Sequence, residues 1–514
     1  MKLYFKKYED DYNSQEWAER MLYLEQLTED LKKQDIKSFT NEKLLDTIED
    51  VNELINYYIS YDNIPKLEKV VEIQKMLIKA GFAGGLKHIG LNLMIINLKR
   101  ADAYLYDKNG NTLLLMEYYE IIVEDICEYV KVIKDSGLND DEKAFILWNC
   151  AYIMHQAIIS GQDSGNNEMV LDLCNKNIEI LEELEKHTEN PVLKDRTADF
   201  YSLYGQLFYS CGDIESGRLF NENALELLSD ISGRTFKDIY LSDYFVSRIL
   251  WTKALYYSEM LTYEDDEKPL FRLAEQIKTF HPENKNVSMI MTAVSGLVKY
   301  NTGLYFQQND DIENGLSYIQ EAAEELENAF GYFDDNTECS KNFFTEALCV
   351  KIYCTLPVLY FSLGTLFSAL EDADEAEKAF LRSLQITGNQ KKYKLSSPSA
   401  SIISALCSRF LGYIYQSYDE TDKAEFYYKQ ALSMSEKQEN SQPVQALTIK
   451  IEVCTLLSAM YLDAKNKKQA SEYSRKGLDA CNSLMKISSE AVQPDVREML
   501  EKINKKSNRK FGIF

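Results

Sequence analysis

The residues that usually hold metals are too sparse in this chain to predict a metal centre. The four histidines stand far apart, whereas two ligands on one helix need a spacing such as i, i+4. The cysteines include no C-x-x-C pair and mostly lie in apolar helical patterns, so we expect buried free thiols in a reducing compartment. The histidines are His88, His155, His187 and His281, and the cysteines are Cys127, Cys150, Cys174, Cys211, Cys339, Cys349, Cys354, Cys407, Cys454 and Cys481.

The sequence also lacks the usual signatures of phosphate binding, calcium binding and nucleophilic catalysis. The glycine cluster at 81–85 does not fit the G-x-x-x-x-G-K-[ST] pattern. In the stretch 107–111 the glycine stands at position four, whereas a calcium loop needs it at position six. No serine lies in a G-x-S-x-G turn. Acidic pairs such as Glu324 with Glu325 are too frequent to indicate acid–base catalysis. We therefore predict a protein that is not an enzyme and uses no metal and no cofactor.

The net charge excludes another class of partner. The 514 residues include 82 acidic and 57 basic side chains, a net charge of −25 at pH 7, whereas nucleic-acid binding needs a basic face that releases counterions. The first residues contain no apolar stretch of signal-peptide type, and no segment approaches ~18 consecutive apolar residues. We predict a cytoplasmic protein that binds neither nucleic acid nor membranes. The last fourteen residues invert the charge and are expected to form a mobile tail, with Lys502, Lys505, Lys506, Arg509 and Lys510.

A repeated spacing of small and aromatic residues organises more than half of the chain. In one copy Gly364 stands twelve residues before Ala376, and the aromatic residues Tyr360 and Phe367 stand four before and three after Gly364. With 35 Tyr and 23 Phe beside only 21 Gly and 8 Pro, the composition favours long helices over turn-rich sheets. Further copies are centred on Gly205, Gly303, Gly412 and Ser458, with a weaker one on Ala254 and a doubtful one on Ala157.

This spacing suits two antiparallel helices that pack closely. The helices can approach only where the facing positions are small, and larger residues one turn away fill the flanking holes. The pattern resembles the tetratricopeptide repeat over roughly residues 190 to 485. The resemblance implies an all-α fold, a right-handed superhelical solenoid of antiparallel helix pairs. Successive copies stand farther apart than the usual 34 residues, for example 48 residues from Gly364 to Gly412, so each unit needs longer helices or connections.

We predict three segments along the chain. Residues 141–490 are expected to hold the repeat array, and residues 491–514 a basic C-terminal tail. Residues 1–140 show apolar side chains at helical spacing, such as Ile48, Val51 and Ile55, without the repeat motif. For this N-terminal helical region, divergent repeats and a separate helical bundle both remain open.

The resemblance also implies where a partner would bind. In the family the first helix of each pair lines the concave face, and positions three before, one after and four after the small residue are available to a ligand. Amides can bond a peptide backbone while tyrosine rings cover its side chains. The acidic body favours a protein or peptide partner of basic or amphipathic character. The predicted binding residues are Gln206, Tyr209, Tyr300, Gln307, Arg409, Tyr413 and Gln416.

The predicted function is a non-catalytic scaffold that binds a protein or peptide on this concave face. The alternative is a peptide-sensing cytosolic signalling regulator, in which closure of the superhelix changes how residues 1–140 act on a partner protein. No basic recognition helix of helix-turn-helix type is found in that region, which argues against a DNA target. An enzyme with an unfamiliar site in residues 1–140 is the third hypothesis.

Overall fold

The fold consists of helices wherever the structure describes the chain. The computed structural model describes residues 15–60, 62–108, 112–163, 167–233, 239–335, 343–388, 398–439, 442–488 and 492–508, and no strand occurs in these ranges. The all-α prediction is therefore confirmed.

The helices are α1 (Gln15–Leu31), η2 (Ile36–Ser38), α2 (Asn41–Ser60), α3 (Ile64–Ala83), α4 (Ile89–Lys108), α5 (Thr112–Lys134), α6 (Asp140–Asp163), α7 (Asn167–Glu185), α8 (Pro191–Ser210), α9 (Ile214–Ser232), α10 (Ile239–Glu264), α11 (Lys268–Ile277), α12 (Lys285–Gln308), α13 (Ile312–Asp335), α14 (Phe343–Ala369), α15 (Ala373–Gly388), α17 (Pro398–Ser417), α18 (Thr421–Lys437), α19 (Pro443–Asp463), α20 (Lys467–Ile487) and α21 (Pro494–Asn508).

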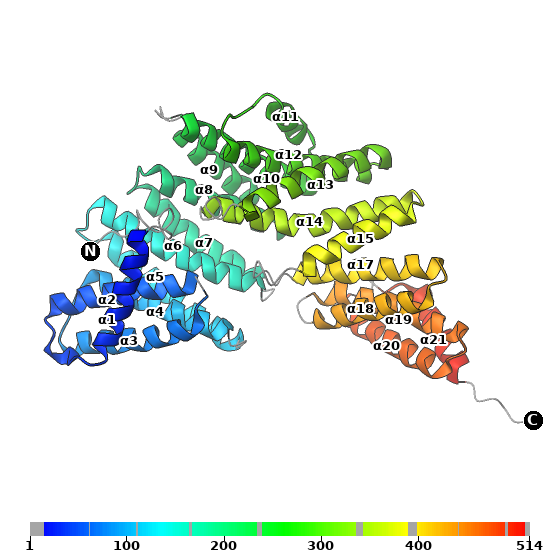
Figure 1. The fold of residues 1–514 in the computed structure, drawn as a ribbon, viewed down its shortest axis with the longest axis horizontal. Helices are drawn as coiled ribbons and strands as arrows, with labels where there is room; N and C mark the ends of the chain where they lie inside the picture. Colours follow the sequence, from blue (N-terminus) through cyan, green and yellow to red (C-terminus); the bar gives the residue numbers. More distant parts are fainter. Residues whose placement is uncertain are drawn as a thin grey trace, which may run out of the picture. The chain divides into compact units, whose positions relative to one another are not determined.

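The chain divides into two compact units. An N-terminal unit contains Met1–Lys237 with Lys341–Phe344, and a C-terminal unit contains Asp238–Ser340 with Thr345–Phe514. In the first unit α2 packs with α3, α4 with α5, α6 with α7 and α8 with α9 (Figure 1). In the second unit α12 packs with α13, α14 with α15, α17 with α18 and α19 with α20. Residue 140, the predicted domain boundary, lies inside the first unit at the start of α6.

Helix pairs approach most closely at the small residue that the sequence pattern marks, which we call the crossing residue. A Cβ atom added to Gly364 would lie 2.5 Å from the ring of Phe380, and one added to Gly412 would lie 2.5 Å from the ring of Tyr428. Both distances are well below the ~3.5 to 4.0 Å of an ordinary carbon contact. The predicted role of the small residues in helix packing is therefore confirmed, and the ring of the second helix fills the space that a side chain would need.

The turn inside each pair repeats with the same geometry. The residue seven positions after the crossing residue has a positive φ, which most side chains avoid. The next residue then donates its backbone N–H to the carbonyl five positions earlier, as from Asp372 to Phe367 at 2.9 Å and from Glu420 to Tyr415 at 2.9 Å. The positive-φ residues are Gly212 (86°), Asp310 (61°), Glu371 (60°), Asp419 (61°) and Lys465 (59°).

Helices α2 and α3 share this turn although the sequence showed no repeat motif there. Asp62 has φ 53°, and Asn63 donates its N–H to the Tyr58 carbonyl at 2.9 Å and caps α3 through its side chain. The crossing position, however, is Ile55 rather than a small residue, and twelve residues later stands Leu67. The pair keeps the turn and loses the close crossing, so the small-residue pattern does not find it.

A side-chain hydrogen bond places further pairs in the same register. Three buried polar residues on second helices each donate to a first-helix carbonyl 26 positions earlier. These bonds are Gln74 to Ile48 at 3.1 Å, Asn177 to Ala151 at 3.0 Å and Ser383 to Pro357 at 2.9 Å. Only the bond from Gln74 to Ile48 lies within residues 1–140, where the same register recurs without the small-residue motif.

The array ends in a packed helix rather than in a mobile tail. Helix α21 buries Leu500 and Ile503 against its neighbours α19 and α20. Ser471 on α20 bonds the side chains of Asn504 and Asn508 at 3.2 and 3.1 Å. The prediction of a mobile tail is therefore wrong as far as Asn508, since the apolar spacing of this segment outweighs its charge. Arg509 and Lys510 lie outside the described residues.

Two helices are long and apolar enough to cross a membrane by length and composition alone. They are the segments Leu348–Ala369 in α14 and Pro443–Asp463 in α19, whose most apolar windows are 50% and 61% buried inside the protein. Burial of this extent is also what a central helix of a repeat array shows, because such a helix packs against helices on several sides. The finding is weak evidence for a membrane span.

The close crossing predicts opposite effects for one substitution at two glycines. Gly364→Ala is expected to lower the stability of the α14–α15 pair by about 1 to 3 kcal/mol, because the new Cβ must displace the Phe380 ring. Gly331→Ala in α13 is expected to raise stability by up to about 1 kcal/mol, since its Cβ would meet nothing within 4 Å. Hydrogen exchange resolved by helix measures both. Equal effects at the two sites would contradict the close crossing.

Candidate functional site

The first helices of three pairs in the C-terminal unit carry an accessible stripe that we call the first-helix face. Its residues recur every three or four positions on α14 and α17, and on α19 with one gap at the buried Thr455; each is exposed or half-buried. Only two of the twelve are charged, in a chain with a net charge of −25. The first-helix face consists of Cys354, Val358, Phe361 and Thr365 on α14, Leu406, Arg409, Tyr413 and Gln416 on α17, and Thr448, Glu452, Ala459 and Leu462 on α19.

Helix α17 brings three of the predicted binding residues together. Tyr413 is 63% exposed and directly follows the crossing residue Gly412. Because Gly412 faces α18, the next residue is rotated by about 100° and faces away from the pair. Gln416 lies one turn later, and its side-chain oxygen accepts a hydrogen bond from the Tyr428 hydroxyl at 2.8 Å. Because this bond uses only the oxygen, the amide N–H groups of Gln416 can donate to a ligand.

Arg409 is the third of these residues and is fixed by two neighbours. It forms an ion pair with Glu452 on α19, and its guanidinium carbon lies 4.5 Å from the centroid of the Phe410 ring. The ion pair joins adjacent helix pairs at the face. A ligand carboxylate would therefore compete with Glu452 for Arg409.

Tyr300 and Gln307 belong to α12 and differ in exposure. Gln307 is half-buried. Tyr300 is only 7% exposed, burial raises its pKa to about 12, and its hydroxyl is hydrogen-bonded to Ser362 on α14. Tyr300 thus packs between two helix pairs, which corrects its prediction as an accessible binding residue.

Gln206 and Tyr209 lie on α8 in the N-terminal unit. Tyr209 has no exposed surface, and a Cβ added to Gly217 would lie 2.7 Å from its ring, so Tyr209 fills the crossing of α8 and α9. Tyr209 was predicted to contact a ligand, and its burial corrects this prediction, as it does for Tyr300. Gln206 is half-buried and donates to the Ser202 carbonyl at 3.2 Å.

Residues six positions before the crossing residue complete the face, and the sequence analysis missed them. They are Val358, Leu406 and Glu452, and the face continues four positions further back to Cys354 on α14 and Thr448 on α19. The prediction used only three positions around each crossing residue, a choice suited to a repeat of 34 residues. Helices α14, α17 and α19 span 27, 20 and 21 residues and so extend the stripe by another turn toward their N-terminal ends. The long spacing between copies was the signal for this extension.

Tyrosine–carboxylate bonds hold successive pairs together behind this face. The Tyr415 hydroxyl donates to Glu377 on α15, and the Tyr461 hydroxyl donates to Glu425 on α18 at 2.5 Å. Burial and the bond to Glu425 raise the pKa of Tyr461 to about 12. Partial burial alone would raise the pKa of Glu425, but its bonds from Lys429 and Tyr461 outweigh this effect and hold the pKa below its ordinary value.

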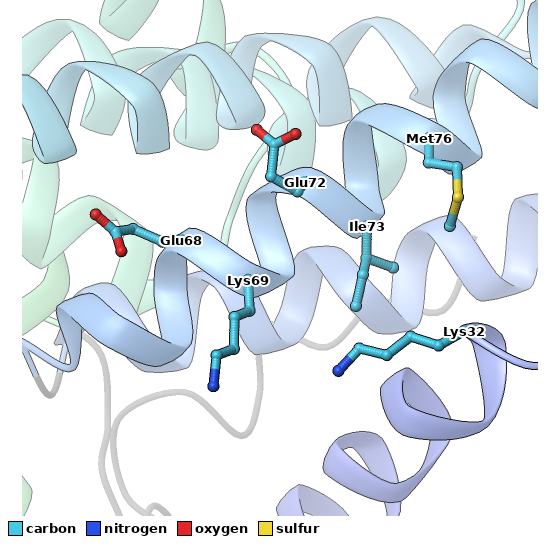
Figure 2. Close-up of a pocket in the computed structure, with 6 residues that line it drawn as sticks. All are labelled: Lys32, Glu68, Lys69, Glu72, Ile73 and Met76. Carbon is cyan, nitrogen blue, oxygen red and sulfur yellow. The ribbon is translucent and has the colours of Figure 1, made fainter.

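A shallow depression in the N-terminal unit offers little for chemistry. It lies between α1 and α3 and is lined by Lys32, Glu68, Lys69, Glu72, Ile73 and Met76. Figure 2 shows the Lys32 and Lys69 side chains reaching into the same opening, while the Glu72 carboxylate points to the other side of α3. The lining contains no serine, cysteine or histidine. Across the described residues, no group of three or more His, Cys, Asp or Glu side chains is arranged to hold a metal ion.

Comparison with known proteins supports the repeat assignment. The sequence profile of the tetratricopeptide repeat matches residues 358–390 and 410–438, which contain the crossing residues Gly364 and Gly412. The chain is therefore similar to tetratricopeptide repeats over these two segments, and its described residues form an array of helix pairs. No curated protein sequence matches it.

The solved structures that match this chain are distant from it in both sequence and structure. The apo form of RapI is 12% identical with a TM-score of 0.41, and the match covers 85% of this chain and 98% of RapI. Aspartyl phosphate phosphatase F from Bacillus subtilis is 14% identical with a TM-score of 0.39, over 84% of this chain and 93% of that one. A human IFIT1 dimer with m7Gppp-AAAA is 13% identical with a TM-score of 0.32, over 90% and 94%. At these values no ligand or activity transfers to this chain.

The lowered pKa of Glu425 predicts how its contribution to stability depends on pH. A carboxyl with a lowered pKa in the folded state stabilises the protein above its unfolded pKa, and this contribution is lost as the pH falls through the folded pKa. Glu425→Gln is therefore expected to lower the urea midpoint at pH 7, and the deficit should shrink from about pH 5 to about pH 3. Glu472→Gln, a control at an exposed carboxyl on α20, should change the midpoint little. A Glu425→Gln deficit that is constant with pH would contradict this assignment.

Proposed function

We propose that the protein is a non-catalytic scaffold that binds a protein or peptide segment on the first-helix face of the C-terminal unit. The observation that carries this proposal is Tyr413, a large side chain that is 63% exposed at the centre of a nearly uncharged face. Its backbone is fixed by the crossing of Gly412 with Tyr428. A preorganised aromatic residue loses little conformational entropy on binding and is a typical interface anchor.

The composition of the face defines the kind of partner. Val358, Phe361 and Leu462 supply apolar contact area, and Gln416 supplies amide groups that suit a peptide backbone. Arg409 and Glu452 neutralise each other, so the face itself adds no net charge. The acidic body attracts basic segments over longer distances. We therefore propose an amphipathic partner segment with an apolar side and basic flanks.

A reducing compartment such as the cytoplasm belongs to the same proposal. The described cysteines form no disulfide. Burial raises the pKa of Cys150, Cys407 and Cys454 to about 12, so these thiols stay protonated and unreactive. Such thiols behave as small apolar side chains of the core.

The regulator hypothesis proposes the same binding face with a different consequence. A peptide sensor must change shape on binding, because its ligand has to favour one of two conformations. A scaffold needs no such change. Small-angle scattering of the protein with and without its captured ligand separates the two, since only the sensor contracts.

The test of the binding face compares two equally exposed aromatic residues. Tyr413→Ala is expected to weaken partner binding by about 30-fold or more, as loss of an interface anchor costs about 2 kcal/mol. Phe426→Ala is the control, because Phe426 is 62% exposed but lies on the second helix of the same pair. Partners are captured from lysate with the wild type, identified by mass spectrometry and titrated against both variants.

Two results would contradict the proposal. If partners bind Tyr413→Ala as tightly as the wild type, the first-helix face is not their binding site. A large fall in the melting temperature of Tyr413→Ala, with none for Phe426→Ala, would show that Tyr413 serves packing.

A further inference from the structure

The end of the C-terminal unit carries lysines that no carboxylate neutralises within the described part of the chain. Lys465 lies in the turn before α20, Lys468 in the first turn of α20, and Lys505 in the last turn of α21; all three are exposed. The bond between Ser471 and Asn504 places the end of α21 beside the start of α20. Several other basic residues of these two helices pair with a glutamate one turn away on their own helix. Segments about 40 residues apart in sequence thus form one basic patch.

The neighbouring turns of the same unit have the opposite charge. The stretches 307–316, 368–377 and 416–425, which contain the turns of three pairs, include twelve acidic residues and one basic residue. In these turns the positive-φ position is occupied by Asp310, Glu371 and Asp419, and in the last turn by Lys465. The repeat therefore places an acidic side chain at this position three times in succession and then reverses its sign.

The acidic turns and the basic patch lie along one edge of the C-terminal unit. The Tyr418 hydroxyl donates to Asp374 at 3.0 Å, which joins the turn of α17 and α18 to that of α14 and α15. Figure 1 shows these turns, the turn between α19 and α20 and the end of α21 along one side of this unit. One edge therefore carries charges of opposite sign at its two ends.

Such an edge is complementary to itself. When a second copy is rotated by 180°, the basic end of each copy faces the acidic turns of the other, and both contacts form at once. We propose that this edge is a salt-sensitive self-association surface, on which Lys465, Lys468 and Lys505 contact the acidic turns of a second copy. The proposal does not depend on the first-helix face.

The surroundings of the patch favour a protein partner over a long polyanion. A nucleic acid or an anionic membrane extends beyond three lysines and meets the acidic turns beside them, which repel it. Leu370 and Tyr418, 45% and 42% exposed at the acidic turns, offer apolar area of the kind that protein interfaces bury. A second copy has the required acidic and basic groups in the required order.

Sedimentation velocity of the full chain tests the proposal first. The Debye length falls from about 10 Å at 0.1 M salt to about 3 Å at 1 M. We expect a dimer at 0.1 M salt that dissociates at 1 M, with a dissociation constant at least tenfold higher. A chain that stays monomeric at 0.1 M salt and about 50 µM would lack even micromolar self-affinity, about −8 kcal/mol, and would overturn the proposal.

Charge exchange at one position of the repeat gives the sharper test. Lys465 and Glu371 occupy the same turn position at φ 59° and 60°, so the backbone accepts either charge there. The variants K465E/K468E/K505E and D310K/E371K/D419K should each weaken the dimer at least tenfold. An equimolar mixture of the two should form more heterodimer than either variant forms homodimer, because one contact keeps its wild-type charges and the other pairs the new glutamates with the new lysines.

The control is Lys486→Glu, at an exposed residue in the last turn of α20 and away from the edge, which should dimerise like the wild type. A wild-type dimer that neither triple variant weakens would overturn the proposal. A different partner would also overturn it. That result would be a monomeric full chain that binds polyadenylate or vesicles with phosphatidylserine, with this binding lost in K465E/K468E/K505E. If circular dichroism shows that a triple variant does not fold, the salt dependence of wild-type self-association still tests the proposal.

Discussion

The distance between the two helices of a pair is the constraint from which the other features of the site follow. At Gly412 the Tyr428 ring occupies the space of a missing side chain. This contact fixes the rotation of α17 about its axis, so Gly412 faces α18 and Tyr413 faces solvent. The same ring carries the hydroxyl that orients Gln416. One close packing contact therefore determines the orientation of two candidate binding residues.

The turn inside each pair adds a second constraint that is independent of the crossing. It survives between α2 and α3, where Ile55 and Leu67 replace the small residues. A non-glycine residue with positive φ costs of order 1 kcal/mol or more, yet in the C-terminal unit the position holds Asp310, Glu371, Asp419 and Lys465. These turns place charged side chains at one edge of the unit, where they are exposed to a partner.

The net charge of −25 conceals an uneven distribution. The first-helix face is almost uncharged, and the ion pair of Arg409 with Glu452 is internally neutral. Acidic residues concentrate in three turns, whereas the start of α20 and the adjacent end of α21 are basic. Each surface thus suits a different kind of contact: an apolar or amphipathic segment on the face, and an oppositely charged protein surface at the edge.

The sequence by itself determined the helix pairs, because close packing requires small residues at fixed spacing and such residues are visible in the chain. Gly364 and Gly412 illustrate this case. Burial, in contrast, depends on which neighbour covers a helix. Tyr300 and Arg409 both stand three positions before a crossing residue, yet Tyr300 is covered by α14 and Arg409 remains accessible. Tyr209 and Gln416 both stand four positions after one, yet Tyr209 fills a crossing whereas Gln416 is exposed.

The tertiary structure also decided features that join distant segments. The basic patch needs the end of α21 beside the start of α20, and a local pattern of lysines does not contain that contact. The pairs of the N-terminal unit are recognised by a turn and by hydrogen bonds over 26 residues. Their polar residues differ from pair to pair, so only the shared geometry relates them. Local sequence sets which helices form and where they cross, whereas exposure and charge clustering arise from contacts between pairs.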